Sequence, residues 1–269
     1  MGLATMFSRR FWFILHSTRH VLICSANFFF ASVCLCADAN SSFAARAERA
    51  FNEAQVKARQ EPTNTAALVQ FSRAAFDWAE FTSKDSQRED VAQRGIDAAR
   101  RAIELSSTNA TAYYWLGMNL GQLARTKTLG ALKLVREMED EFYRARGFDA
   151  HIDYAGPDRS LGLLYRDAPG WPTSIGSKKQ AREHLENAVR LHPEFPDNQL
   201  ALLESFEKWA DRQSFERQLK ITEQTMNAAK EKFSGPMWEQ SWADWNKRFA
   251  EMKSKSGSVG KSQPSKGVK

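Results

Sequence analysis

The stretch KKQAREHLENAVRLHP, Lys178–Pro193, decides the fold class. Its small and apolar residues recur at the three- and four-residue spacing of one helix face: Ala181, Leu185, Ala188 and Leu191. Ser177 and Gln180 form a capping box before it, and Pro193 closes it. The stretch therefore predicts an amphipathic helix with alanines on its apolar face.

The same pattern occurs in two earlier segments. Its members there are Ala99, Ala102 and Leu105, and then Phe142, Ala145 and Phe148. The alanines Ala102, Ala145 and Ala188 are spaced by 43 residues. A fixed spacing of this size indicates repeated structural units.

The helix that precedes each of the last two segments carries a Leu-Gly pair. These pairs are Leu161-Gly162-x-x-Tyr165 and Leu116-Gly117-x-x-Leu120. Small residues let two helices approach closely, and bulky residues fill the space to the neighbouring hairpin. In these motifs the chain resembles the tetratricopeptide repeat (TPR) superfamily. The resemblance implies an all-α fold, a solenoid of helical hairpins over residues 40–252 that ends in a C-terminal capping helix.

Periodicity and turn signals place the expected helices. Their approximate ranges are 43–59, 65–81, 87–105, 110–125, 128–147, 157–167, 178–191, 197–211, 214–233 and 236–252. Ser86 and Glu89 form a second capping box, and the two Gly-Pro pairs, Gly156-Pro157 and Gly235-Pro236, are expected to start helices.

A narrower resemblance rests on the segment from Gly170 to Gly176 and the helix after it. The matching helix residues are Lys178, Ala181, His184, Leu185 and Ala188. This segment is similar to the T-component family, the TPR subunits associated with tripartite ATP-independent periplasmic (TRAP) transporters. That resemblance implies a periplasmic solenoid, able to form homo-oligomers, that helps deliver a small ligand to a periplasmic solute-binding protein.

Residues 1–39 are expected to be a signal peptide. Arg9 and Arg10 precede an apolar run, Val21–Cys36, and small residues suited to cleavage follow at Ala37 and Ala39. The alternative is an uncleaved N-terminal membrane anchor, although the run is shorter than the roughly 20 residues of a spanning helix. Cleavage would place the protein in the periplasm of a bacterial cell envelope, with no stable membrane span.

The three cysteines of the chain, Cys24, Cys34 and Cys36, all lie in this N-terminal segment. A cleaved chain would therefore have neither a disulfide nor a reactive thiol. Large residues precede each cysteine, so a lipid-attachment site is poorly supported.

The net charge of +6 is concentrated at the two ends of the chain. Residues 1–37 contain three arginines and no acid, and residues 253–269 contain five lysines and no acid. The residues between are therefore close to neutral, which argues against a nucleic-acid partner. Residues 253–269, rich in Ser, Gly and Lys, are expected to be a disordered basic tail.

No motif supports an enzyme, a cofactor or a metal site. Gly170–Lys178 resembles a phosphate loop only loosely, because a helix precedes it where the motif requires a strand. The histidines after the signal segment lack the spacing of metal ligands. A nucleophilic serine in a G-x-S-x-G motif is also absent from the sequence.

The best candidate for a binding site is a rim of aromatic and charged residues around the loop Asp167–Gly176. Its members are Arg125, Lys127, Tyr154, Asp158, Arg159, Tyr165, Arg166 and Trp171. Aromatic side chains beside charges suit a ligand pocket or an anchor for a protein partner. In the alternative interpretation the charges pair within the chain and Trp171 plugs a gap in its hairpin.

The last helix carries one apolar stripe: Trp238, Trp242, Trp245, Phe249 and Met252. A solenoid must cover its last hydrophobic face, so this helix is expected to cap the array, with Arg248 on its polar side. The sequence predicts a non-catalytic scaffold, with a TRAP-associated accessory as the sharper version. The alternative is an envelope module that binds a peptide or partner protein on its concave face.

Overall fold

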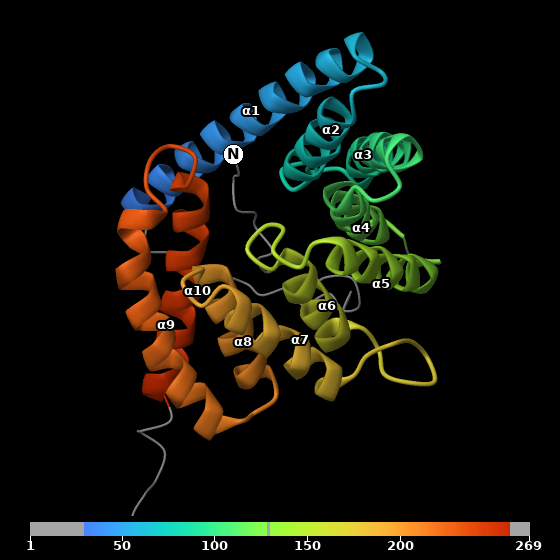
Figure 1. Ribbon diagram of the computed structural model, residues 1–269. Coiled ribbons are helices and arrows are strands. Elements are labelled where there is room, and N and C mark those ends of the chain that lie inside the picture. Colours follow the sequence, from blue (N-terminus) through green and yellow to red (C-terminus); the bar gives the residue numbers. More distant parts are fainter. Residues whose placement is uncertain (1–29, 128–129, 259–269) are drawn as a thin grey trace, which may run out of the picture. The chain divides into compact units, whose positions relative to one another are not determined.

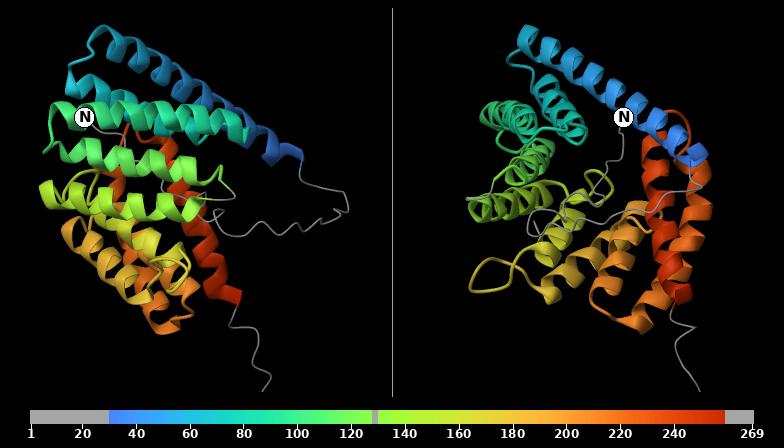
Figure 2. Two further views of the ribbon diagram at one scale, coloured as in Figure 1. Left: turned by 90° about the vertical axis from the view of Figure 1, so that its right-hand side faces the viewer. Right: turned by 180° about the vertical axis from the view of Figure 1, so that it is seen from behind.

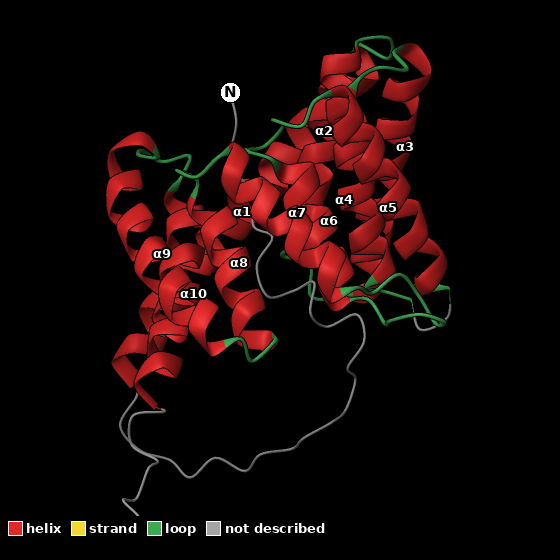
Figure 3. Cartoon of the chain, turned by 60° about the horizontal axis from the view of Figure 1, so that its bottom comes forward, coloured by secondary structure: helices red, strands yellow, loops and turns green. Residues whose placement is uncertain are grey.

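The computed structural model describes residues 30–127 and 130–258 (Figure 1). In this part of the chain all regular structure is helical, as Figure 3 shows. The helices are α1 (Phe30–Gln60), α2 (Thr65–Ala79), α3 (Asp85–Leu105), α4 (Ala110–Ala124), α5 (Ala131–Phe148), α6 (Gly156–Asp167), α7 (Lys178–Leu191), α8 (Pro196–Lys208), α9 (Arg212–Lys232) and α10 (Glu239–Ser258). The predicted all-α fold of helical hairpins is confirmed.

Two predicted helix starts need correction. α3 starts at Asp85, its N-cap is Lys84, and no side chain caps it, so the capping box at Ser86 is wrong. α10 begins at Glu239 rather than at Pro236, because a turn follows Gly235, whose φ of 90° is left-handed. By contrast, the Ser177 side chain accepts a hydrogen bond from the backbone N–H of Gln180, so this predicted cap is confirmed.

The first and last helices are longer than the sequence suggested. α1 starts at Phe30 and runs through the predicted cleavage points Ala37 and Ala39. α10 continues to Ser258, so the first residues of the expected disordered tail are helical. The basic n-region and residues 259–269 lie outside the described part, so the signal peptide and the rest of the tail stay predictions.

The described chain divides into two compact units. The N-terminal unit contains residues 30–152, with α1 to α5, together with the loop at 167–175. The C-terminal unit contains residues 153–166 and 176–258, with most of α6 and all of α7 to α10. No helix in the described ranges is both long and apolar enough to span a membrane.

In the N-terminal unit, successive helices pack as antiparallel neighbours, which Figure 2 shows for α3, α4 and α5. Its first hairpins share a core in which Phe51 of α1 contacts Phe71 of α2, with ring centroids 5.4 Å apart. Alanines such as Ala75 and Ala102 fill the remaining contacts between these helices. Apolar burial of this kind is the main stabilising contribution in a helical array.

The Leu-Gly pairs lie where two helices of a hairpin meet. A Cβ at Gly117 of α4 would be 2.6 Å from a ring carbon of Phe142 on α5. A Cβ at Gly162 of α6 would be 2.5 Å from Leu185 Cγ on α7. Such distances are too short for any other residue, so the predicted packing of glycine against a bulky residue is confirmed in both hairpins.

The C-terminal unit has an aromatic core, in which Phe195, Phe233, Trp238 and Trp245 are all buried. α10 packs on α8 and α9, as Figure 3 shows, and the apolar stripe supplies two of these residues, Trp245 on α10 and Trp238 in the turn before it. The stripe thus covers the hydrophobic side of the last hairpin, as expected for a capping helix.

Candidate functional site

Trp171 is the most exposed large apolar residue that the structure describes. It lies in the loop between α6 and α7, and 89% of its side chain surface is accessible. Two backbone hydrogen bonds restrain the loop around Trp171. The N–H groups of Thr173 and Ser174 both donate to the carbonyl oxygen of Gly170, at 3.1 and 3.3 Å. The interpretation of Trp171 as a buried plug is therefore wrong.

Asp158 is fully buried in the C-terminal unit. One of its carboxylate oxygens is 2.8 Å from Nδ1 of His184, and the other accepts a hydrogen bond of 2.6 Å from Asn187. The ring of Tyr165 stacks on His184, with centroids 5.7 Å apart. These contacts join α6 to α7 and hold the imidazole in a fixed orientation.

Arg159 is also fully buried, and carboxylates surround it. Its Nη2 is 2.8 Å from Asp153 Oδ2, and its Nε is 3.2 Å from Asp197 Oδ2 on α8. Its Nη1 donates to Asn198 Oδ1 at 2.8 Å, and its guanidinium lies over the ring of Phe195. A guanidinium enclosed in this way by side chains of its own chain does not face a ligand.

Tyr154 lies in a turn before α6 and is half-buried. Its ring stacks on Phe195, with centroids 4.4 Å apart and an interplanar angle of 13°. Burial raises the pKa of its hydroxyl, against the opposing effect of Lys232. Tyr154 therefore belongs to the edge of the aromatic core.

Three other predicted rim residues also have partners within the chain. Nη1 of Arg166 donates to Oγ of Ser205 at 3.2 Å. In the N-terminal unit, Arg125 forms a largely buried ion pair with Glu80 at 2.9 Å. Lys127 forms a more exposed ion pair with Glu89.

The predicted rim is therefore not a single pocket. Asp158, Arg159 and Tyr165 are buried among the helices of the C-terminal unit, whereas Trp171 is exposed. The residue types suggested a pocket because paired charges beside aromatics look alike whether they face a ligand or a neighbouring helix. Of the eight candidates, Trp171 alone keeps the features of an anchor.

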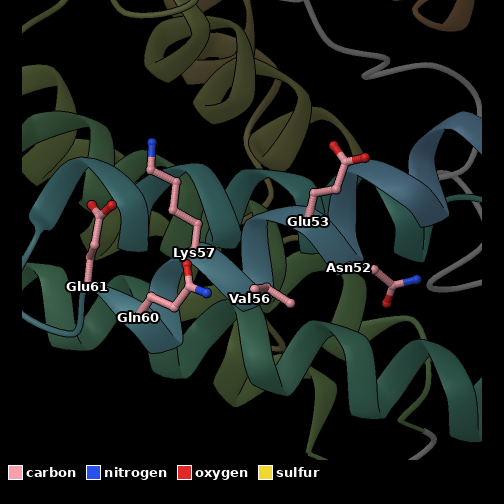
Figure 4. Close-up of a pocket in the computed structure, with 6 residues that line it drawn as sticks. All are labelled: Asn52, Glu53, Val56, Lys57, Gln60 and Glu61. Atoms are coloured by element: carbon pink, nitrogen blue, oxygen red, sulfur yellow. The ribbon is translucent and has the colours of Figure 1, made fainter.

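A surface depression lies along α1 (Figure 4). Five of its lining residues lie on α1, namely Asn52, Glu53, Val56, Lys57 and Gln60, and the sixth, Glu61, directly follows that helix. Within the described part of the chain no second helix contributes to this lining, so the depression lacks the concave walls of a small-molecule site.

Within the described ranges, no cluster of three or more His, Cys, Asp or Glu side chains could hold a metal ion. Lys178, the lysine of the loose phosphate-loop pattern, lies over the ring of Trp209, 5.6 Å from its centroid. That contact directs its ammonium group to an aromatic face.

Comparison with known proteins adds a family resemblance for the first five helices. Residues 36–145 match a family model. Its description is "Regulator of microtubule dynamics protein 1-3". The match covers most of α1, all of α2 to α4 and most of α5, and less than half of the chain.

A solved structure, the crystal structure of MamA protein, is also similar. It shares 16% sequence identity over 71% of this chain and 91% of that chain, with a TM-score of 0.47. No curated protein matches the sequence.

A group of charged residues in the C-terminal unit was not predicted from the sequence. Arg248 of α10 is fully buried, whereas we predicted it on the polar side of that helix. Its Nε and Nη2 donate to the two carboxylate oxygens of Glu204, at 2.8 and 3.1 Å, and its Nη1 pairs with Asp197. The sequence spacing indicates this burial, because Arg248 follows Trp245 by three residues and precedes Met252 by four, which places it on the buried face of the helix.

Proposed function

We propose that this chain is a non-catalytic helical-repeat protein that binds a protein partner through the loop carrying Trp171. The observation that supports the proposal is the 89% exposure of that side chain on a restrained loop. Large aromatic side chains dominate binding energy in protein interfaces, and they lose little entropy when their backbone is already held. A tryptophan in this position would otherwise be a liability for solubility.

The sharper form of the proposal is an exported, periplasmic accessory of a TRAP-type solute transporter. It is supported by the basic and apolar N-terminal segment and by the T-component-like residues from Gly170 to Ala188. In this form the partner is a solute-binding protein, and Trp171 anchors it.

The other form, a peptide held on the concave face of the repeats, has less support. The first helices of the hairpins, α4, α6 and α8, are buried over most of their residues. They therefore offer few side chains to a peptide that would lie along them.

The match of residues 36–145 favours a second candidate function, which is regulation of microtubule dynamics. In this case the N-terminal unit would carry the activity, and tubulin would be the partner. Co-sedimentation of the full chain with microtubules tests this candidate directly.

The Trp171 proposal is tested by crosslinking in the native host. A photoreactive amino acid replaces Trp171 in one variant and the neighbouring exposed Thr173 in another, and crosslinked proteins are identified by mass spectrometry. We expect one major partner at position 171. A solute-binding protein supports the transporter form, and tubulin supports the second candidate.

The identified partner then allows a quantitative test. Trp171→Ala should weaken its binding by about 2 kcal/mol or more, whereas Thr173→Ala should have little effect. Equal affinity of wild type and Trp171→Ala would overturn the proposal. Unfolding measurements on the same samples show whether any loss of affinity comes from a folding defect instead.

A further inference from the structure

The turn before α6 has an unusual backbone. Three consecutive residues, none of them glycine, have left-handed φ angles: Asp153 at 49°, Tyr154 at 55° and Ala155 at 63°. Side chains with a Cβ disfavour this conformation, and a run of three is held only where surrounding contacts determine it. The contacts around this turn should therefore reveal what controls its conformation.

Two buried side chains, Arg159 and Asn198, make polar contacts to the turn. Nη1 of Arg159 donates to the carbonyl oxygens of Asp153 and Tyr154, both at 3.2 Å, and Nη2 donates to Asp153 Oδ2 at 2.8 Å. Nδ2 of Asn198 donates to the Tyr154 carbonyl oxygen at 3.0 Å. One buried guanidinium thus binds both carbonyls and the carboxylate of the strained segment.

The same guanidinium faces Asp197 on its other edge. Asp197 Oδ2 is 3.2 Å from Arg159 Nε, but the two groups are not aligned as a hydrogen bond. The second oxygen, Oδ1, pairs with Arg248. Asp197 is 1% exposed and both arginines are fully buried, so one carboxylate is shared between two guanidinium groups away from water.

Arg248 connects this carboxylate to the C-terminal helix. It is held by Glu204 of α8, by Asp197 and, at 3.3 Å, by Asp244 of α10 itself. Burial alone would lower the pKa of Arg248, but Glu204 and Asp197 outweigh it and raise that pKa well above its usual value. Because Arg248 belongs to α10, its permanent positive charge lies beside the carboxylates of α8 only when α10 is packed against α8.

We propose that docking of α10 fixes the left-handed turn at residues 153–155 through the charge chain Arg248–Asp197–Arg159. With α10 in place, Arg248 satisfies Asp197, and Arg159 remains committed to the carbonyls of the turn. With α10 displaced, Arg159 is the nearest cation left to Asp197. It turns to align with that carboxylate and releases the turn, which relaxes to an ordinary backbone conformation.

The location of the turn indicates which part of the chain a change in its conformation would affect. It lies between α5 and α6, at the first of three points where the described chain passes between the two units. A change in its φ angles acts as a hinge movement of the connecting chain. A partner that displaces α10 would therefore alter the connection between the units from a distance, through one shared carboxylate.

Hydrogen–deuterium exchange of the full chain tests this inference. Arg248→Met removes the charge but keeps an apolar chain of similar length, and Met252→Ala shortens another buried residue of α10 outside the charge chain. For Arg248→Met we expect amides of residues 153–159 to exchange at least roughly tenfold faster than in wild type, while Met252→Ala leaves them nearly unchanged.

A second variant keeps the test decisive if Arg248→Met does not fold. Glu204→Gln weakens the hold on Arg248 without removing the arginine, and it should accelerate exchange at residues 153–159 by a smaller factor. The inference would be overturned if amide exchange at residues 153–159 is unchanged in both Arg248→Met and Glu204→Gln. If Arg248→Met does not fold, unchanged exchange in Glu204→Gln alone would overturn it. An equal acceleration in Met252→Ala would do the same, because the turn would then follow overall stability.

Discussion

Gly162 on α6 and Leu185 on α7 are in such close contact that a Cβ on the glycine would lie 2.5 Å from Leu185 Cγ. Leu185 is fully buried and its backbone N–H is also near, so the leucine has little room to move. This contact brings the two helices of the hairpin together. Adding a single methyl group at Gly162 measures how much this contact contributes to the free energy of unfolding.

Gly162→Ala should destabilise the protein by about 1–3 kcal/mol, because the added methyl overfills the contact. The matched control is Gly147→Ala on α5, where a Cβ would meet nothing within 4 Å. That change should be neutral or stabilising by up to about 1 kcal/mol, since alanine favours helix. Urea unfolding compares them, and equal stability of the two variants would contradict the observed packing.

Arg125 and Lys127 were both predicted at a binding rim, but their ion pairs differ in burial. The Arg125–Glu80 pair is 11% and 7% exposed, whereas the Lys127–Glu89 pair is 33% and 46% exposed. Arg125→Met should cost about 3–5 kcal/mol of unfolding free energy, because it removes a cation that faces a buried carboxylate. Lys127→Met should cost at most about 1 kcal/mol, as surface pairs do.

Chemical denaturation of both variants measures this difference. A small effect of Arg125→Met would mean that the arginine is not needed for the fold, and it would restore Arg125 as a candidate binding residue.

Glu141 of α5 should make stability depend on pH. Burial raises the pKa of its carboxyl above the usual 4.5, and its Oε2 accepts no hydrogen bond within the described chain. The folded state therefore binds this proton more tightly than the unfolded state does. The tighter binding of this proton stabilises the folded state at low pH. This stabilisation is lost as pH rises from about 4.5 through the raised pKa of Glu141.

Glu141→Gln should accordingly raise the melting temperature at pH 7, and its advantage should vanish near pH 4. Glu48→Gln, at an exposed position of α1, is the control and should show no such trend. A constant difference between Glu141→Gln and wild type at all pH values would show that the carboxyl is not desolvated.

Export is predicted from the N-terminal segment, of which residues 1–29 lie outside the described part of the chain. N-terminal sequencing of the protein from its native host should start at Asp38 or Asn40. An intact Met1 on a membrane-embedded protein would contradict the signal peptide and support the alternative anchor.

The helices could be predicted because their apolar residues repeat along one face and their ends carry turn residues. The bounds of α7, 178–191, were predicted without error, since Ser177 and Pro193 mark both ends. The start of α3 at Asp85 was missed, because its N-cap residue, Lys84, contributes no side-chain hydrogen bond and leaves no signal in the sequence.

The site was harder to predict, because charge pairing depends on residues far apart in the sequence. Asp158 and Arg159 are neighbours in the chain, yet their contacts include His184 and Asp197. Such partners meet only when the helices pack, and the spacing of residues along the sequence does not show which side chains of different helices will meet. Trp171 could be singled out because its neighbours, Gly170 and Pro172, mark it as a loop residue from the sequence alone.

The exposure of Trp171 also gives the protein an intrinsic optical probe. The other tryptophans in the described part of the chain are buried or half-buried, including Trp115, Trp238 and Trp245. An aqueous quencher such as acrylamide should therefore reach the indole of Trp171 first and suppress the red edge of the emission. Protection of that emission would report docking of a partner onto this loop in unlabelled protein and in real time.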